Sequence, residues 1–234
     1  MTLAIILAGG LGTRLQSTVP NLPKPMAPIN GRPFLEYQMD YWIAQGIDHF
    51  VLSVGYRKEY IINHFGKAYQ GFAIDYIEED TPLGTGGALL LAVEHIPQDN
   101  PVLVLNGDTF FEVNFKELKA FHVLKDSQWT FSLFQADEKK RYAGIKINED
   151  GAILSLKSET TDLSSLANGG VYLIDPRVLK KVGFLAGEKA SLENDLLQNL
   201  IKQKVRLNGV EFDGLFIDIG VPLDYERASS LLGP

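Results

Sequence analysis

The residues most able to do chemistry stand at the start of the chain, where an apolar segment runs directly into glycines. Leu3–Leu7 is followed by Ala8-Gly9-Gly10-Leu11-Gly12-Thr13, and Arg14 comes next. Glycines allow tight turns and bring backbone N–H groups close to an anion. Arg14 offers a planar fork of donors for phosphate oxygens. This segment therefore predicts a strand that ends in a phosphate-binding loop.

A second cation, Lys24, stands between Pro23 and Pro25. The prolines stiffen the backbone, and Pro25 biases Lys24 towards an extended conformation. A lysine with a restrained backbone is more typical of a group that holds a phosphate than of a solvated charge on the surface. We therefore expect Lys24 to contact the same polyphosphate as Arg14.

Two aspartates accompany apolar runs further along the chain. Asp108 follows the apolar segment 102–105, and Asp218 stands between apolar residues in 216–219. Ligands gather at the carboxyl ends of strands in an open parallel sheet, and a carboxylate among apolar residues needs a partner. Each aspartate alone could be a turn residue. Together they predict a Mg²⁺ site, because Mg²⁺ prefers one or two carboxylates with phosphate oxygens and water.

Residues 82–87 form a second glycine-rich segment before a helix expected to begin at Ala88. This segment is either a flexible turn or a place where the backbone approaches a flat base, and the sequence leaves both open. Two other phosphate motifs do not fit. The first loop has Leu15 where a Rossmann fingerprint needs a small residue, and no G-x-x-x-x-G-K-[ST] run occurs.

Strand-like and helical patterns alternate through the first half of the chain. Strands are expected at 3–7, 50–54, 72–77 and 102–105, and helices at 35–45, 58–65 and 88–93. This alternation predicts an α/β fold, a Rossmann-like, mostly parallel mixed sheet with helices on both faces.

The pattern becomes more mixed after about residue 127. Strands are expected at 129–134, 144–147, 153–156 and 171–174, and helices at 192–202 and 225–232. No linker-like segment interrupts the chain. We therefore expect a single domain over 1–234, with a nucleotide-binding half at 1–125 and a second half at 126–234.

The bulk composition narrows the functional class. The chain has 234 residues and a net charge of −7, which argues against a nucleic-acid partner. It has no cysteine, which excludes disulfides, thiolate metal sites and cysteine nucleophiles. No apolar run approaches the roughly 20 residues that span a bilayer, and the opening segment lacks the basic flank of a signal peptide. We expect no membrane partner and a cytoplasmic location.

These motifs resemble those of the sugar-1-phosphate nucleotidyltransferases, also called NDP-sugar pyrophosphorylases, in the same order along nearly the whole chain. The family loop L-A-G-G-x-G-T-R-L is present at 7–15, and the K-P pair is Lys24-Pro25. The base loop P-L-G-T-[AG]-G is at 82–87, and N-G-D ends at Asp108. The segments N-x-G-x-Y, the acidic helix start and D-I-G-x-P-x-D-Y are at 168–172, 191–193 and 218–225.

The resemblance implies a reaction in which a sugar 1-phosphate attacks the α-phosphorus of a nucleoside triphosphate and releases pyrophosphate, with Mg²⁺ as cofactor. It implies that 126–234 mainly binds the sugar and ends in the closing helix. The implied catalytic residues are Arg14, Lys24, Asp108 and Asp218, of which Asp108 and Asp218 hold the metal. The implied nucleotide contacts are Leu7, Ala8, Gly9, Gly10, Gly12, Thr13, Arg14, Lys24, Gly84, Thr85 and Gly107. The implied sugar-phosphate contacts are Gly144, Lys157, Asn168 and Glu193.

One position departs from the family pattern. Many members carry E-K-P after the central hairpin, whereas this chain has Lys157-Ser158-Glu159, so Lys157 would substitute from a different register. The chain looks most like bacterial D-glycero-D-manno-heptose 1-phosphate guanylyltransferases, which transfer GMP from GTP. Mannose-1-phosphate guanylyltransferases, uridylyl or thymidylyl relatives and a non-catalytic nucleotide-sugar-binding subunit are the alternatives. A homo-oligomer is compatible with the sequence.

Overall fold

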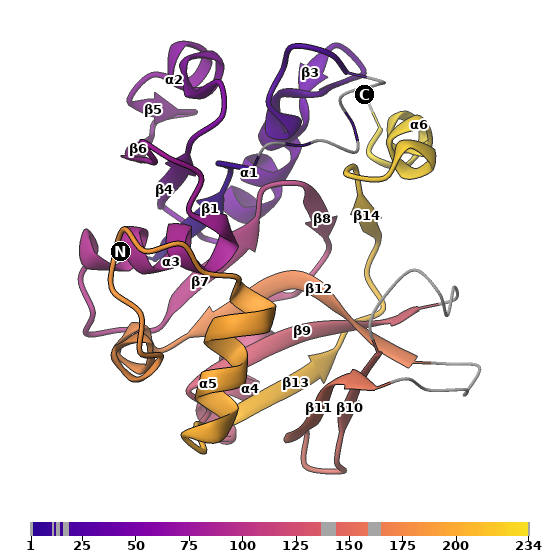
Figure 1. Ribbon diagram of the computed structural model, residues 1–234. Coiled ribbons are helices and arrows are strands. Elements are labelled where there is room, and N and C mark those ends of the chain that lie inside the picture. The colour runs from indigo at the N-terminus through magenta and orange to yellow at the C-terminus, as the bar shows by residue number, and fades with distance from the viewer. Residues whose placement is uncertain are drawn as a thin grey trace.

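The structure is a computed structural model that describes residues 2–10, 12, 15, 19–136, 144–158 and 165–233. A large mixed sheet runs through the molecule in the order β11-β10-β12-β7-β1-β4-β6-β5, and β9 and β13 continue it beside β12 (Figure 1). Its strands are β1 (Leu3–Leu7), β4 (His49–Val54), β5 (Ala68–Tyr69), β6 (Phe72–Glu78), β7 (Val102–Asn106), β9 (Trp129–Ala136), β10 (Gly144–Ile147), β11 (Ile153–Ser158), β12 (Ser165–Ile174) and β13 (Leu207–Glu211).

Helices and two small ladders complete the described part of the chain. The ladders are β2 (Pro28–Ile29) with β3 (Arg32–Pro33), and β8 (Thr109–Phe111) with β14 (Phe216–Asp218). The helices are η1 (Lys24–Met26), α1 (Phe34–Ala44), α2 (Lys58–Phe65), α3 (Gly84–Glu94), α4 (Phe115–Leu124), η2 (Pro176–Lys181), η3 (Leu192–Leu196), α5 (Leu197–Lys202) and α6 (Pro222–Leu231).

Strand β1 shows why the sheet is covered on both faces. It runs parallel to β4 and β7, and its side chains alternate between two apolar clusters, as the period of a strand requires. Ile5 lies in one cluster with Leu89 of α3, and Ile6 lies in the other with Met39 of α1. A continuous apolar run is typical of such a two-sided buried strand. The prediction of a mostly parallel sheet between helices is confirmed.

The second half of the chain makes the sheet mixed. Strand β12 is antiparallel to β7 and to β9, whereas β13 is parallel to β9. Strand β12 therefore joins the parallel first half to the second half within one sheet. This second half includes helix α5 and strand β13, which lie in the lower part of the view in Figure 1.

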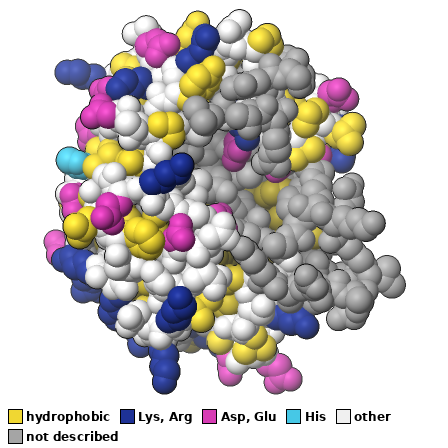
Figure 2. All heavy atoms as spheres, viewed as in Figure 1, with side chains coloured by type: hydrophobic (Ala, Val, Ile, Leu, Met, Phe, Trp, Pro, Cys, Tyr) yellow, Lys and Arg dark blue, Asp and Glu magenta, His cyan; other side chains and the backbone are white. Residues whose placement is uncertain are grey.

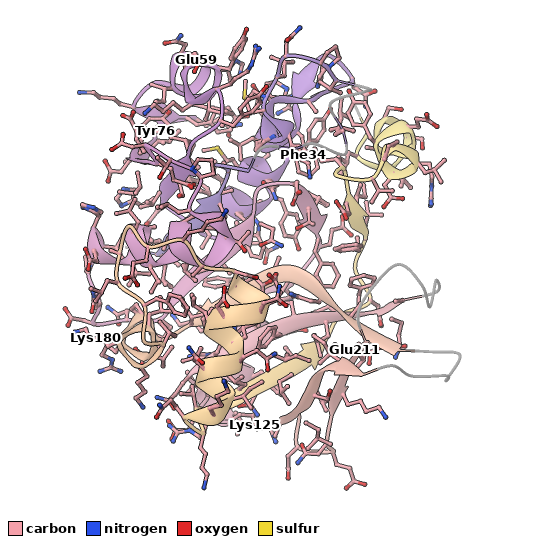
Figure 3. All side chains as sticks on the ribbon, viewed as in Figure 1. Phe34, Glu59, Tyr76, Lys125, Lys180 and Glu211 are labelled. Carbon is pink, nitrogen blue, oxygen red and sulfur yellow. The ribbon has the colours of Figure 1, made fainter. Side chains whose placement is uncertain are left out.

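A third apolar cluster holds the β8–β14 ladder against the start of α1. It includes Phe34, Phe110, Ile217 and Ala228. Phe34, labelled in Figure 3, is the first residue of α1 and packs in this cluster with Ile217 of β14 and Ala228 of α6. This cluster fixes the C-terminal segment beside the residues that follow β7, a step that brings distant parts of the sequence together.

The structure differs from the predicted elements in several places. Helix α3 begins at Gly84 rather than Ala88, and the helix expected at 192–202 begins as a π-helix, η3, before α5. Helix α4 was not predicted, although Asn114 caps it by accepting from the Glu117 N–H (3.2 Å). An N-cap Asn followed three residues later by Glu is a recognisable helix start.

Charges on the described part of the visible surface are interspersed rather than gathered by sign (Figure 2). Lysines and arginines stand beside acidic side chains over much of this face. None of the helices that the structure describes combines the length and apolar surface needed to cross a bilayer.

Candidate active site

A cavity of about 440 Å³ opens where β1 and β7 end, between the first glycine loop and the start of α3. Carboxyl ends of parallel strands are the usual place for ligands in such a sheet. The residues lining the cavity are Leu7, Ala8, Gly9, Gly10, Gly12, Lys24, Pro25, Glu79, Pro82, Gly84, Thr85, Ala88, Asn106, Gly107, Asp108 and Lys189. They include every described residue that the sequence assigned to the nucleotide. Thr13 and Arg14 lie outside the described residues.

Two glycines allow the loops around the cavity to approach each other. The Gly107 N–H donates to the Leu7 carbonyl oxygen (3.0 Å), and a Cβ on Gly107 would lie 2.6 Å from that oxygen. A Cβ on Gly9 would collide with the Glu79 carboxylate. Both positions therefore need glycine because of close packing, and the Asn106-Gly107-Asp108 segment is held directly on the end of β1.

Asp108 and Asp218 come together although 110 positions separate them in the numbering. Strands β8 and β14 pair with Asp218 opposite Thr109, and the Ile219 N–H donates to the Asp108 carbonyl (3.0 Å). A Cβ placed on Gly220 would lie 2.8 Å from Asp218 Oδ1 and 3.3 Å from Asp108 Oδ2. Two carboxylate oxygens therefore border one small space at the edge of the cavity.

The oxygen donors of this pair fit a hard cation such as Mg²⁺. In the described ranges of the chain, no group of three or more His, Cys, Asp or Glu side chains could hold a metal ion. Asp108 and Asp218 would therefore hold Mg²⁺ only with further oxygen ligands, for which phosphates and water are the usual sources. Their role as metal ligands stays a prediction.

The backbone at Lys24 differs from the sequence-based expectation. Lys24 is not extended; it begins the single 3₁₀ turn η1. The turn is closed by hydrogen bonds from the Met26 N–H to the Pro23 carbonyl (2.8 Å) and from the Ala27 N–H to the Lys24 carbonyl (2.9 Å). These two bonds outweigh the bias that Pro25 places on the preceding residue.

The side chain of Lys24 lies between the glycine loop and the acidic pair. Its Nζ donates to Asp108 Oδ2 (2.8 Å), and the side chain is only 13% exposed. Its stem passes over Gly12, which has φ +64°, and a Cβ there would lie 2.7 Å from Lys24 Cγ. Gly12 thus serves both the left-handed backbone and the passage of the lysine.

The second glycine segment is mostly the first turn of α3. The N–H groups of Gly86 and Gly87 donate to the Ala190 carbonyl (3.0 and 3.1 Å). A Cβ on Gly86 would lie 2.9 Å from the Ser191 carbonyl carbon, so this glycine serves packing against the segment before η3. Gly84 and Thr85 remain at the cavity wall. The sequence left two alternatives open for this segment, a flexible turn and a backbone that approaches a base. Gly86 and Gly87 form neither, because their N–H groups bind the Ala190 carbonyl.

The four residues assigned to the sugar phosphate are placed differently from one another. Gly144 begins β10 and pairs with Ser158 of β11. Lys157 lies in β11, and its side chain is outside the described part. Asn168 on β12 donates to the Tyr172 hydroxyl (2.7 Å), and Glu193 is in η3, where it accepts from Ser191 Oγ (3.4 Å).

Tyr172 accepts a hydrogen bond from Asn168, and the charges of Glu193 and Asp108 act on its hydroxyl. Burial raises the pKa of Tyr172, and the nearby carboxylates of Glu193 and Asp108 raise it further. The Tyr172 hydroxyl therefore lies in the electrostatic reach of both acids. Two contacts place the segments of Asn168 and Glu193 near the cavity: a Cβ on Gly170 would lie 2.8 Å from Asn106 Nδ2, and the Leu192 N–H donates to Thr85 Oγ1 (3.3 Å). The contacts of Asn168 and Glu193 with a sugar stay predictions.

Sequence reasoning missed Glu79, a buried carboxylate in the cavity wall. Burial raises its pKa, while the hydrogen bond that Oε2 accepts from the Leu83 N–H (3.0 Å) lowers it. Glu79 was hidden in the acidic run Glu78-Glu79-Asp80, which reads as a solvated surface. The available signal was the alternation of β6 continued by one residue: Glu78, the last residue of the strand, pairs with Lys58, whereas the next residue, Glu79, is buried.

Gln38 was also missed. It is a buried residue of α1, and its Nε2 donates to the carbonyls of Asn106 (2.8 Å) and Thr109. These two carbonyls flank Asp108, so Gln38 holds the loop that carries this carboxylate. A lone glutamine in an apolar helix gave no sequence signal for such a role.

Comparison with known proteins agrees with this geometry. Residues 3–233 match the nucleotidyl transferase family. The chain is 41% identical to D-glycero-alpha-D-manno-heptose 1-phosphate guanylyltransferase of Aneurinibacillus thermoaerophilus over 98% of this chain and 97% of the relative. The protein of that name from Campylobacter jejuni is also 41% identical, over 95% and 96%.

Solved structures extend the similarity to the fold. HddC from Yersinia pseudotuberculosis complexed with GMP-PN superposes with a TM-score of 0.86 at 33% identity, covering 100% of both chains. A second crystal structure of HddC from the same organism superposes with a TM-score of 0.87. A match over nearly the whole sequence, together with the glycine-lined cavity, shows that the chain belongs to the nucleotidyl transferase family.

Proposed function

We propose that this chain transfers GMP from GTP to D-glycero-α-D-manno-heptose 1-phosphate and releases pyrophosphate. The main structural support is that Lys24, Asp108 and Asp218 border one space at the edge of a glycine-lined cavity. The choice of sugar and base is supported by the names of the two relatives at 41% identity. A homo-oligomeric state and a cytoplasmic location remain predictions.

In the proposed reaction, a phosphate oxygen of the sugar 1-phosphate attacks the α-phosphorus of GTP. The new P–O bond forms as the bond between the α-phosphorus and its bridging oxygen breaks, and the electron pair leaves with pyrophosphate. The protein has to align two anions and to neutralise the charge that develops between them. No covalent intermediate with the chain is needed.

The described residues can meet these demands. The backbone of the first glycine loop would face the triphosphate, and Lys24 would place its ammonium on phosphate oxygens near the reacting centre. Asp108 and Asp218 would hold Mg²⁺, which supplies positive charge to the phosphates when bound. Gln38 would keep Asp108 in position through the carbonyls on either side of it.

Glu79 supports guanine as the base. A carboxylate presents two acceptor oxygens, and guanine carries two adjacent donors, N1–H and N2–H, on its Watson–Crick edge. Uracil and thymine place carbonyl oxygens beside their single N–H, and adenine places an acceptor nitrogen beside its amino group. Cytosine, like adenine, places an acceptor nitrogen beside its amino group. Although Oε2 of Glu79 already accepts from the Leu83 N–H, the remaining lone pairs of this buried carboxylate in the cavity wall would favour guanine over the other bases.

The test is turnover with a panel of substrates. The protein is incubated with Mg²⁺, each nucleoside triphosphate and a panel of sugar 1-phosphates, and pyrophosphate release is followed. We expect the highest kcat/KM with GTP and D-glycero-α-D-manno-heptose 1-phosphate. Release only with UTP or dTTP would contradict the guanylyl assignment, and highest activity with mannose 1-phosphate would contradict the heptose. Product binding without turnover for any pair would favour a regulatory subunit.

A further inference from the structure

The Lys24 ammonium lies against the acidic pair, Asp108 and Asp218, whose negative charge a divalent cation would need for binding. Its Nζ lies 2.8 Å from Asp108 Oδ2, and the point where a Cβ on Gly220 would lie is 2.7 Å from the same Nζ. That point is also 2.8 Å from Asp218 Oδ1 and 3.3 Å from Asp108 Oδ2. Among the described residues, the Lys24 ammonium and the carboxylates of Asp108 and Asp218 therefore border the same small space.

An ammonium and a divalent cation compete for the same carboxylate. They repel each other, and each needs the Asp108 oxygen lone pairs for its own contacts. While Lys24 stays on Asp108, a second cation therefore meets a carboxylate whose charge is already balanced. Among the described residues no third carboxylate joins Asp108 and Asp218 in a metal-binding group, so the acidic pair has little left to offer a metal ion by itself.

The lysine has an alternative position. Its backbone is fixed in η1, but a four-carbon stem lets the ammonium pivot. The stem runs along Gly12, and Lys24 lines the same cavity as the glycine loop. Phosphates bound by that loop would lie next to the lysine and would attract its ammonium away from Asp108.

We propose that Lys24 is the resident counter-ion of Asp108 in the free protein and moves to the nucleotide's phosphates on binding, so that nucleotide and divalent cation bind with positive coupling. This inference rests on the proposed function for the identity of the nucleotide. Coupling between two ligands is reciprocal and typically amounts to about 5- to 150-fold in affinity. The free protein is accordingly a weak metal binder, and GTP is the ligand that makes the acidic pair available.

The test measures Mn²⁺ affinity without nucleotide, from the electron paramagnetic resonance signal of free Mn²⁺. Lys24→Met removes the charge with little change of length, and Lys24→Arg retains it. Lys58→Met is the matched control, because Lys58 also forms an ion pair, with Glu78 (2.7 Å), but does not line the cavity. Circular dichroism confirms that each variant is folded.

We expect Lys24→Met to bind Mn²⁺ about tenfold more tightly than the unchanged protein, within the range given above. Lys24→Arg and Lys58→Met should match the unchanged protein. The gain should vanish in Lys24→Met combined with Asp108→Asn, since the released carboxylate is then absent. Equal or weaker Mn²⁺ binding by folded Lys24→Met, or a gain that persists without Asp108, would overturn the proposal.

This readout separates the two proposals. A tighter Mn²⁺ affinity in Lys24→Met together with no turnover on any substrate would support the lysine exchange and contradict the proposed function. Turnover of GTP by the unchanged protein together with unaltered Mn²⁺ affinity in Lys24→Met would do the reverse.

Discussion

Substitution of Gly220 by alanine tests the geometry of the acidic pair with one added methyl group. The new Cβ would lie 2.7 Å from Lys24 Nζ, 2.8 Å from Asp218 Oδ1 and 3.3 Å from Asp108 Oδ2. Ordinary contacts with carbon begin at about 3.5 Å, so the two nearest atoms must each move by roughly 0.7 Å. All three atoms are ends of side chains, and Gly220 does not adopt a positive φ. The fold can therefore accept the change, whereas the charged groups cannot keep their positions.

The expected effect falls on turnover rather than on stability. A misplacement of about 1 Å in a reacting site can cost about 100-fold in rate, and we expect kcat of Gly220→Ala to fall by that order. Replacing glycine without backbone strain stabilises by about 0.4–1 kcal/mol through the unfolded chain, which offsets the local crowding. The Tm should therefore stay within about 4 °C, the shift that about 1 kcal/mol produces at this chain length.

The assay is pyrophosphate release at saturating GTP and sugar 1-phosphate, with thermal melting of the same preparations. Gly220→Ser, which adds one more atom at the same point, should be at least as slow as Gly220→Ala. A kcat within about threefold of the unchanged protein would refute the reasoning, because the groups around Gly220 would then not be the reacting centre. A large fall in Tm would refute the claim that only side-chain ends are displaced.

Four further substitutions address neighbouring groups. Asp108→Asn and Asp218→Asn should each lower kcat by more than the roughly 10- to 100-fold that loss of an outer-shell partner costs, with folded far-UV circular dichroism; near-normal rates would mean that the site is elsewhere. Gln38→Leu should weaken Mn²⁺ binding in the presence of GTP by about tenfold, and an unchanged titration would exclude its positioning role. Burial raises the pKa of Glu79, so the folded state holds its proton more tightly and loses stability as pH rises; the Tm of Glu79→Gln relative to the unchanged protein should therefore increase from pH 5 to pH 8, and a constant difference would contradict this.

Local patterns in the sequence were sufficient to predict the parts of the fold that depend on residues close together along the chain. The apolar run of β1 predicted a strand buried on both faces, and its two clusters with α1 and α3 confirm that arrangement. The position of Asp108 after β7 followed from the same reasoning, because ligands lie at the carboxyl ends of parallel strands. Helix α4 carried its own start signal at Asn114 and could have been predicted.

Other features depend on contacts between distant segments and left little local trace. Lys24 adopts a turn because of two backbone hydrogen bonds, against the preference that Pro25 imposes. The start of α3 is set by the Ala190 carbonyl, which lies over a hundred positions further along the chain. The depth of Glu79 in the cavity wall follows from tertiary packing, which a run of three acids conceals.

The central claim is that Asp108 and Asp218 hold one divalent cation beside the bound nucleotide. Crystals grown with Mn²⁺ and a non-hydrolysable GTP analogue test it through the anomalous scattering of manganese. We expect one peak at about 2.0–2.4 Å from a carboxylate oxygen of both aspartates, with Lys24 Nζ moved from Asp108 to phosphate. A nucleotide in the cavity with manganese bound away from both aspartates would contradict it.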